Sequence, residues 1–323
     1  MIHLDNLEQL NGKTPWAPKN LFERAKLGVE TVEKAIALKK VGLKLKFFSS
    51  EADSFTKFLF ALVQEKTIGE GKNHLLISAS LRATFKETIV LFEPFGIVCE
   101  TIPLTCEGIV NLELLHSAIY PTTMGCILEP YDSITGVVQP VEKVCEILGR
   151  ERHLHLVSTS SFGLQGLGAR VSSMQIGPML MIPHGWPLPS TFDLDQIVAL
   201  TSTFQENLEK SQEQAMHLSY LRRFFERSLE AMGAKIFFKE QQRAPGVVVF
   251  GFEGLHGELL AYNLCQKGIF VSIGGGDRPS LHAHLTRMEI EEQLAVTAVH
   301  ICLHPDHDEL ILQKVIDAIR EMR

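Results

Sequence analysis

The chain has few of the features that mark membrane, secreted or nucleic-acid-binding proteins. Among its 323 residues there is no apolar run of membrane-spanning length, and the first residues lack the basic and apolar regions of a secretory signal. The formal net charge of −7, without a long stripe of Lys or Arg, argues against nucleic acid as a partner. Six cysteines are scattered without a CxxC pair, which is typical of reduced thiols. We therefore expect a cytoplasmic protein that binds neither membranes nor nucleic acid.

Lysine is absent from one long segment of the chain, since none occurs between Lys143 and Lys210. Imine formation with a carbonyl cofactor requires a primary amine, which among side chains only lysine supplies. The window from 144 to 209 therefore cannot hold such a cofactor covalently. In other respects the composition is ordinary: 45% of the residues are hydrophobic, 21% are charged, and the length allows two domains.

Apolar runs and helical stretches alternate through the first 200 residues. The strand candidates are 74–79, 97–99, 125–128 and 153–157, and the helix candidates between them are 84–92, 112–119 and 141–148. Strands separated by helices of this length predict a mainly parallel sheet that is covered on both faces. The fold class that we predict is therefore α/β and doubly wound.

The pattern changes after residue 203. Apolar residues recur at helical spacing through 203–232, followed by strand candidates at 235–239, 247–252, 269–273 and 299–303 and a helix at 258–266. The last helix is predicted to begin at Asp306, whose carboxylate would cap it while Glu309 completes a capping box. We therefore predict a large domain over 15–200 and a small α+β domain formed by 1–14 with 201–323.

Six short landmarks occur in order along nearly the whole chain. They are Leu4-Asp5-Asn6, Ser50-Glu51-Ala52, Leu76-Ile77-Ser78-Ala79, Gly136-Val137-Val138-Gln139-Pro140, Ser190-Thr191 and Val271-Ser272-Ile273-Gly274. Together they resemble the cysteine desulfurases of the class V aminotransferase family, which use pyridoxal phosphate (PLP). The resemblance implies the fold type I architecture of PLP-dependent transferases, with a large sheet domain and a smaller α+β domain. It also implies a homodimer.

The chemistry of that family depends on five side chains. They are a lysine that forms the Schiff base, an aspartate beside the ring nitrogen, a histidine stacked on the ring, a nucleophilic cysteine and an arginine for the substrate carboxylate. At these positions, in the same order, the resemblance places Gln175, Ser158, Arg82, Asp277 and Pro305. An amide forms no imine, a serine hydroxyl is neutral, and a guanidinium transfers no proton near neutral pH. Without a thiolate there is no persulfide, and without an arginine there is no bidentate clamp.

The phosphate end of the family's site is better preserved. The resemblance places hydroxyl side chains there at Ser50, Ser161, Ser173 and Thr191. Ser50 lies in a loop that opens a helix, where backbone N–H groups favour an anion. The alternative is that these residues cap helices and turns, as Ser and Thr commonly do. We expect no covalent cofactor, and non-covalent PLP or phosphate stays an open alternative.

Two functions are compatible with these residues. The first is a non-catalytic homologue with a binding or regulatory role in iron–sulfur or sulfur metabolism. Its partner would be a true desulfurase or an iron–sulfur assembly protein. The second is an active PLP-dependent enzyme of the family that uses a displaced lysine such as Lys86, or a different reaction.

A metal site is the remaining alternative. His300, Cys302 and His304 alternate along one strand and therefore share one face. Their spacing matches no known ligand set, and a half-buried strand that ends at a polar loop explains the same pattern. We therefore predict no metal.

Overall fold

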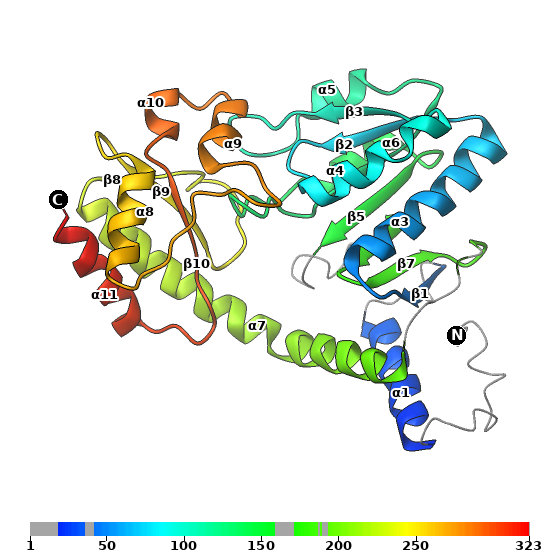
Figure 1. The fold of residues 1–323 in the computed structure, drawn as a ribbon, viewed down its shortest axis with the longest axis horizontal. Coiled ribbons are helices and arrows are strands. Elements are labelled where there is room, and N and C mark those ends of the chain that lie inside the picture. Colours follow the sequence, from blue (N-terminus) through cyan, green and yellow to red (C-terminus); the bar gives the residue numbers. More distant parts are fainter. Residues whose placement is uncertain (1–18, 36–41, 159–170, 187, 189–192, 323) are drawn as a thin grey trace. The chain divides into compact units, whose positions relative to one another are not determined.

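The computed structural model describes residues 19–35, 42–158, 171–186, 188 and 193–322. These residues form two compact units, and each is described by itself. Unit 1 comprises the residues up to 102 with 112–130 and 141–210, and unit 2 comprises 103–111, 131–140 and the residues from 211 onward. The helix α7 (Leu194–Ala231) runs from unit 1 into unit 2 (Figure 1). The domain boundary predicted at residue 200 thus falls within a continuous helix, and residues 1–14 lie outside the described ranges.

Unit 1 alternates strands and helices along the chain. Its elements before α7 are α1 (Lys19–Ala35), β1 (Leu43–Phe47), α3 (Glu51–Leu62) with a π-helical turn η2 (Val63–Ile68), β2 (His74–Ser78), α4 (Ala83–Val90), a 3₁₀ turn η3 (Glu93–Phe95), β3 (Val98–Ile102), α5 (Leu112–Ser117), β4 (Thr123–Leu128), α6 (Val141–Leu148), β5 (His153–Ser158), β6 (Ser173–Ile176) and β7 (Met179–Pro183).

The strands of unit 1 form one seven-stranded sheet in the order β1-β7-β6-β5-β4-β2-β3. Neighbouring strands from β6 to β3 are parallel, and β7 is antiparallel to both of its neighbours, β6 and the edge strand β1. The chain moves outward from β2 to β3 and then returns past β2 to β4 and β5. Because crossovers between parallel strands are right-handed, this reversal places α4 on one face and α5 and α6 on the other. The predicted mainly parallel, doubly wound sheet is confirmed.

One face of this sheet packs against α3. The helix buries Phe55, Phe58 and Leu59 along one side, in an apolar cluster that also contains Leu75 of β2 and Val157 of β5. The strands β2, β4 and β5 are buried along their whole length, as expected for parallel strands covered on both faces. This burial explains why their sequences are continuous apolar runs.

Unit 2 is built on a three-stranded antiparallel sheet in the order β10-β9-β8. Its elements after α7 are β8 (Ala234–Ile236), β9 (Val247–Phe252), α8 (Gly257–Gln266), α9 (Leu281–Arg287), α10 (Glu292–Ala295), β10 (Val299–Cys302) and α11 (Glu309–Arg320). Phe225 of α7, Phe250 of β9 and Leu260 of α8 belong to its core. In the described ranges of both units, no helix combines the length and the apolar character needed to cross a bilayer.

The last helix begins later than the sequence predicts. Its N-cap is Asp308, whose carboxylate accepts a hydrogen bond from the backbone N–H of Ile311 at 2.8 Å, so the prediction of Asp306 as the cap is wrong. The preceding residues close a turn of their own, because the N–H of His307 donates to the carbonyl of His304 at 3.0 Å. Asp306 lies inside that turn and cannot open a helix.

The segment 269–273 is also not the strand that the sequence predicts. It forms only an isolated bridge, between Ser272 and His300. The three glycines that follow, Gly274, Gly275 and Gly276, all have positive φ, a backbone conformation that does not continue a β-strand.

Candidate functional site

The carboxyl ends of β2 and β4 are the expected ligand site of this sheet, because the chain direction reverses between the two strands. Arg82 follows β2, Glu129 follows β4 directly, and Glu51 is the first residue of α3. Arg82 forms ion pairs with both carboxylates, and Gln175 of β6 is hydrogen-bonded to the backbone of Glu51. We call these four residues the switch-point cluster.

The Arg82 guanidinium binds Glu51 through two parallel hydrogen bonds. Nη1 donates to Oε2 at 2.9 Å and Nη2 donates to Oε1 at 2.5 Å, which is the bidentate geometry of strong carboxylate pairs. Nε lies 3.4 Å from Oε1 of Glu129, and the guanidinium carbon lies 4.5 Å from the centre of the Phe85 ring. Arg82 and Glu129 are only 7% and 3% exposed. Two carboxylates and an aromatic ring therefore hold the arginine in place.

Gln175 is fully buried in β6 and connects this strand to α3. Its Nε2 donates to the backbone carbonyl of Glu51 at 2.8 Å and to that of Gly177 at 3.0 Å. At the position where the resemblance expects a Schiff-base lysine, the chain thus has an amide that attaches the start of α3 to the sheet. Of the five predicted catalytic positions, Gln175 and Arg82 are brought together, and Glu51 links them.

The N-terminus of α3 is capped by its own side chains. Ser50 is the N-cap, and its Oγ accepts a hydrogen bond from the backbone N–H of Asp53 at 3.1 Å. Oδ2 of Asp53 accepts in turn from the hydroxyl of Ser49 at 2.9 Å. Glu51 and Asp53 also place carboxylates in the first turn, where the helix dipole favours negative charge. With Glu129 nearby, this arrangement opposes a dianionic phosphate electrostatically.

The hydroxyl of Ser173 is engaged inside the core. Nε2 of His153 and Nδ1 of His155 lie 2.6 Å and 2.7 Å from it. The His155 ring is stacked on Phe58 at 3.5 Å, and the His153 ring is stacked on Trp186 at 5.0 Å. Burial lowers the pKa of His153 to about 3 and the pKa of His155 well below its usual value, so both rings are neutral. Ser173 therefore joins a buried polar group beneath α3.

The other predicted positions lie apart from the switch-point cluster in the chain. Ser158, although distant from Gln175 in the sequence, is the buried last residue of β5 and is paired with Ile176 of β6, next to Gln175. Ser161 and Thr191 lie outside the described residues. Asp277 and Pro305 belong to unit 2, where Asp277 follows the three glycines and Pro305 lies in the turn before α11.

Two lysines of unit 1 are candidates for the alternative in which a lysine elsewhere in the chain holds the cofactor. Lys86 donates a hydrogen bond to the carbonyl of Ala79, in the turn after β2, at 2.8 Å. Lys46 of β1, which the sequence analysis missed, is 1% exposed, and burial lowers its pKa to about 8. Lys46 is paired with Leu180 of β7, which is paired with Gln175 of β6. Paired residues share a sheet face, so Lys46 and Gln175 lie in one row.

The sequence analysis also missed the two carboxylates of the switch-point cluster. Glu129 directly follows the apolar run of β4, and a carboxylate at the carboxyl end of a buried parallel strand points to the ligand edge of a sheet. The position of Glu129 could therefore have been recognised from the sequence as a candidate site residue. Glu51 offered no local signal, because its partner Arg82 lies 31 positions away.

A buried acid–base pair stabilises unit 2. Asp132 accepts hydrogen bonds from Nε2 of His284 at 2.7 Å and from the backbone N–H groups of Ile134 and Thr135 at 2.8 Å each. Burial alone would raise the pKa of Asp132, but these partners together hold it below its ordinary value. The pair connects the 131–140 loop to α9 within this unit.

These side chains do not fit PLP held by the family's Schiff base. The window from 144 to 209 contains no amine, and both amide hydrogens of Gln175 have backbone acceptors. Arg82, at the ring-stacking position, is already bound by Glu51 and Glu129. The resemblance places Ser158 at the position of the ring-nitrogen acid, and its hydroxyl is neutral, so this side chain cannot be a charged partner for a ring nitrogen.

For metals, the described part of the chain contains no group of three His, Cys, Asp or Glu side chains arranged as ligands. His300 is instead half-buried in β10, where burial and then the nearby Arg278 lower its pKa to about 4. A histidine in that environment is neutral at physiological pH.

Comparison with known proteins gives relatives at low identity, although no model of a protein family matches the chain. The cysteine desulfurase IscS of Clostridium botulinum (strain Kyoto / Type A2) is 23% identical over 281 residues, covering 77% of this chain and 70% of the relative. IscS of Rickettsia felis is 24% identical over 305 residues, covering 80% and 72%. Among solved structures, a NifS-like protein matches with a TM-score of 0.79 at 19% identity, over 94% of this chain and 88% of the other.

The structural matches show the fold alone. A glutamate decarboxylase of Lactobacillus brevis also matches, with a TM-score of 0.74 at 11% identity over 94% of this chain and 79% of the other. Proteins of different activity thus share this architecture. The sequence matches are more specific, because they carry the name cysteine desulfurase and extend over most of the chain. By sequence and fold together, the chain is similar to the NifS/IscS-like cysteine desulfurases, at low identity.

Proposed function

We propose that this chain is a non-catalytic member of the family that acts by binding, as a partner or regulator. The observation that carries the proposal is the switch-point cluster. The resemblance places Gln175 where the family's chemistry needs a primary amine, and the Gln175 side chain attaches α3 to β6. Arg82, at the ring-stacking position, is held by two carboxylates.

The energetics of this cluster oppose a cofactor in its place. A PLP ring and phosphate at the carboxyl ends of β2 and β4 would have to displace the bidentate Arg82–Glu51 pair or bind beside it. Breaking this part-buried pair is costly, because the Arg82 guanidinium is only 7% exposed and would lose its bidentate counter-ion. The hydroxyl of Ser50 is already used as a helix cap, so it offers little to offset that cost. We therefore propose no covalent PLP and no PLP-dependent turnover.

The proposed role lies in sulfur or iron–sulfur metabolism. The relatives are named cysteine desulfurases, and a homologue that keeps their fold keeps a scaffold on which their interaction surfaces can persist. The proposed partners are a true desulfurase or an iron–sulfur assembly protein, in addition to a second copy of the chain.

A second candidate function is favoured by one observation. Lys46 is buried, its pKa is lowered to about 8, and it lies in the same sheet row as Gln175. A lysine with a lowered pKa is partly neutral near physiological pH and can attack a carbonyl. The alternative is therefore an active PLP-dependent enzyme that uses Lys46, or Lys86, in place of a residue at 175.

The test is to mix the purified chain with PLP, record its visible spectrum, and map pyridoxyl adducts by mass spectrometry after borohydride reduction. Sulfide release from cysteine is measured in parallel, with Lys46→Arg and Lys86→Arg as matched variants. We expect no specific adduct and no sulfide above a heat-inactivated control. A stoichiometric adduct on Lys46 or Lys86, lost in the matching variant and accompanied by turnover, would establish the enzyme instead.

A further inference from the structure

Unit 2 carries a surface groove with a volume of about 520 Å³ that is separate from the switch-point cluster of unit 1. It is lined by residues 106–107, 230, 234–241, 289–291 and 294. Ile236 and Phe237 are buried at its floor, and Phe238 and Ile290 are half-buried beside them. The floor of the groove is therefore apolar.

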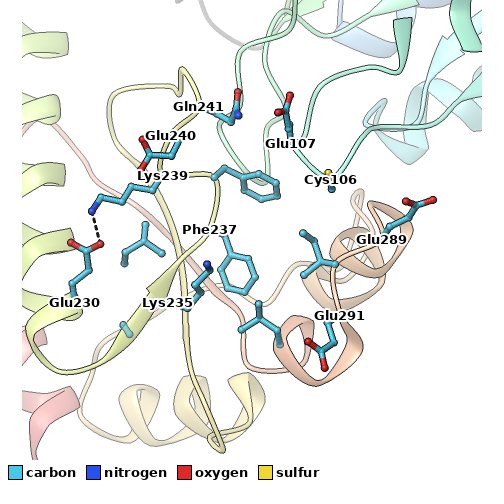
Figure 2. A pocket seen from close by; sticks show the side chains of 15 residues that line it. Cys106, Glu107, Glu230, Lys235, Phe237, Lys239, Glu240, Gln241, Glu289 and Glu291 are labelled. Atoms are coloured by element: carbon cyan, nitrogen blue, oxygen red, sulfur yellow. Dashed lines mark hydrogen bonds and ion pairs between the residues drawn. The ribbon is translucent and has the colours of Figure 1, made fainter. Parts of the chain in front are cut away.

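The rim of the groove is negatively charged. Four exposed glutamates surround the Phe237 ring in Figure 2, namely Glu107, Glu240, Glu289 and Glu291. Within the described ranges, none of these four carboxylates forms an ion pair. The lining also contains one Glu–Lys ion pair and one further lysine, which leaves a net charge of −3. We call this surface the acidic groove, and its charge suits a partner that is cationic and apolar at once.

One wall of the acidic groove is the edge of a β-sheet. In the described part of the chain, β8 pairs with β9 and with no other strand, so it is an edge strand. All three residues of β8, Ala234, Lys235 and Ile236, line the groove. Successive side chains of a strand point to opposite faces, so a groove that touches three residues in succession runs along the edge of the strand. The backbone N–H and C=O groups of such an edge can pair with an extended peptide.

Two unusual backbone conformations also belong to the acidic groove. Within the described ranges, Phe238 and Glu289 are the two residues other than glycine with positive φ, at 53° and 62°. Both of them line the groove. Bulky residues rarely adopt this conformation, and such outliers gather at binding sites, where the surrounding structure holds them. The Phe238 ring packs against Gly108, where an added Cβ atom would lie 3.2 Å from it. These contacts indicate a built surface rather than a chance gap between segments.

We propose that the acidic groove binds an extended basic segment of a partner protein, which adds as a strand to the free edge of β8. An apolar side chain of the segment would reach the floor, and Arg or Lys side chains would bind the glutamates of the rim. Single exposed ion pairs contribute little, so the affinity depends on backbone pairing and on several charges together. A free polyamine has the charge but lacks the apolar side chain and the peptide backbone. The inference rests on the proposed binding role and names the chemistry of the partner.

The test measures fluorescence anisotropy of the labelled peptide Lys-Val-Arg-Leu-Arg-Val-Lys, in which basic and apolar side chains alternate, with the full chain. Three matched peptides each change one property. In the first, glutamate replaces every basic residue; in the second, serine replaces every apolar residue; in the third, methyl groups on the backbone nitrogens remove the donors of a strand. In the protein, Glu107→Gln with Glu291→Gln removes two charges of the rim. Glu87→Gln with Glu142→Gln, at exposed positions of unit 1, is the matched control.

We expect the parent chain and the control to bind the basic peptide equally, and the rim variant to bind it at least about tenfold more weakly, because two attractive charges are lost. Each matched peptide should also bind the parent at least about tenfold more weakly. Circular dichroism checks that both variants are folded.

The proposal is overturned if the parent does not bind the basic peptide, or if the rim variant binds it as tightly as the control does. It is also overturned if any matched peptide binds as tightly as the basic one. PLP-dependent turnover by the parent would overturn the proposed function but would leave these binding results unchanged, so the two failures are distinguishable.

Discussion

The side chains of the switch-point cluster stabilise one another, and each is costly to remove alone. Arg82 carries one positive charge between Glu51 and Glu129, and both Arg82 and Glu129 are nearly excluded from solvent. A buried ion pair of this kind adds little net stability compared with apolar residues, yet removing one partner leaves the other charged and desolvated. The same reasoning explains why Arg82 is not free to bind an incoming anion.

We predict that Arg82→Met destabilises the protein by about 3–5 kcal/mol, because two carboxylates lose their buried counter-ion. The free energy of unfolding is measured by urea denaturation at pH 7. In the double variant Arg82→Met with Glu129→Gln, one of the orphaned charges is gone, so part of the loss should be recovered. A single-variant effect below about 1 kcal/mol would show that the pair is solvated rather than buried.

The buried histidines predict a specific loss of stability in acid. The pKa of His153 is about 3 in the folded state and 6.5 in the ordinary reference, because burial disfavours the charged ring. Between pH 6.5 and pH 3 the unfolded chain therefore binds more protons, and the free energy of unfolding falls as the pH falls. His153 alone should contribute a loss of about 2 kcal/mol by pH 5. His155 acts in the same direction.

The measurement is a series of urea denaturation curves between pH 7 and pH 4. The variant His153→Phe keeps an aromatic ring against Trp186 but has no titrating nitrogen. The free energy of unfolding of this variant should therefore fall less steeply as the pH is lowered. An identical slope for the parent and the variant would show that His153 does not titrate between the two states.

Among the secondary-structure elements, α11 offers the clearest test, because two aspartates compete for its start. Asp308 caps the helix through Ile311, whereas Asp306 lies in the preceding turn. Replacing an aspartate N-cap by alanine costs about 0.5–2 kcal/mol. We therefore predict that Asp308→Ala lowers the free energy of unfolding by that amount, while Asp306→Ala changes it little. Thermal denaturation of the two variants side by side decides between the positions, and the reverse order would restore the cap that the sequence predicts.

The elements of unit 1 were predictable because burial leaves a periodic trace in the sequence. The helix over 141–148 agrees with the prediction residue for residue, and the strands of the sheet centre appear as apolar runs because both of their faces are covered. The contacts of the site were not predictable in the same way. Gln175 and Glu51 are hydrogen-bonded across 124 positions, and no local pattern encodes which loop faces which strand. Lys46 was missed for a related reason. A lysine in a short strand is typical of an exposed edge strand, and only the structure shows that this side chain is buried.

At the scale of the whole molecule, the fold and the chemistry of the family are separable. The seven-stranded sheet and its reversal between β2 and β4 are retained, so the frame that would orient a cofactor is present. Our proposal is that the groups that would react with it are replaced at the positions that the resemblance identifies. A chain under these conditions can bind and be bound without catalysing a reaction.

We predict that restoring single family residues will not create a cysteine desulfurase. Gln175→Lys supplies an amine but leaves Arg82 paired with Glu51 and Glu129. Catalytic groups that act as a unit are strongly non-additive, so returning one member recovers little. Sulfide release from cysteine, with PLP and a reductant, is measured for Gln175→Lys, Ser158→Asp and Asp277→Cys alone and combined.

We expect the parent and each single variant to remain at the level of a heat-inactivated control, whereas any turnover should require the combined variant. Activity confined to that variant would support the non-catalytic proposal, because a frame with the right geometry would be shown to lack only the reacting groups. Robust turnover by the parent chain would overturn it, and the buried Lys46 would then be the first residue to replace.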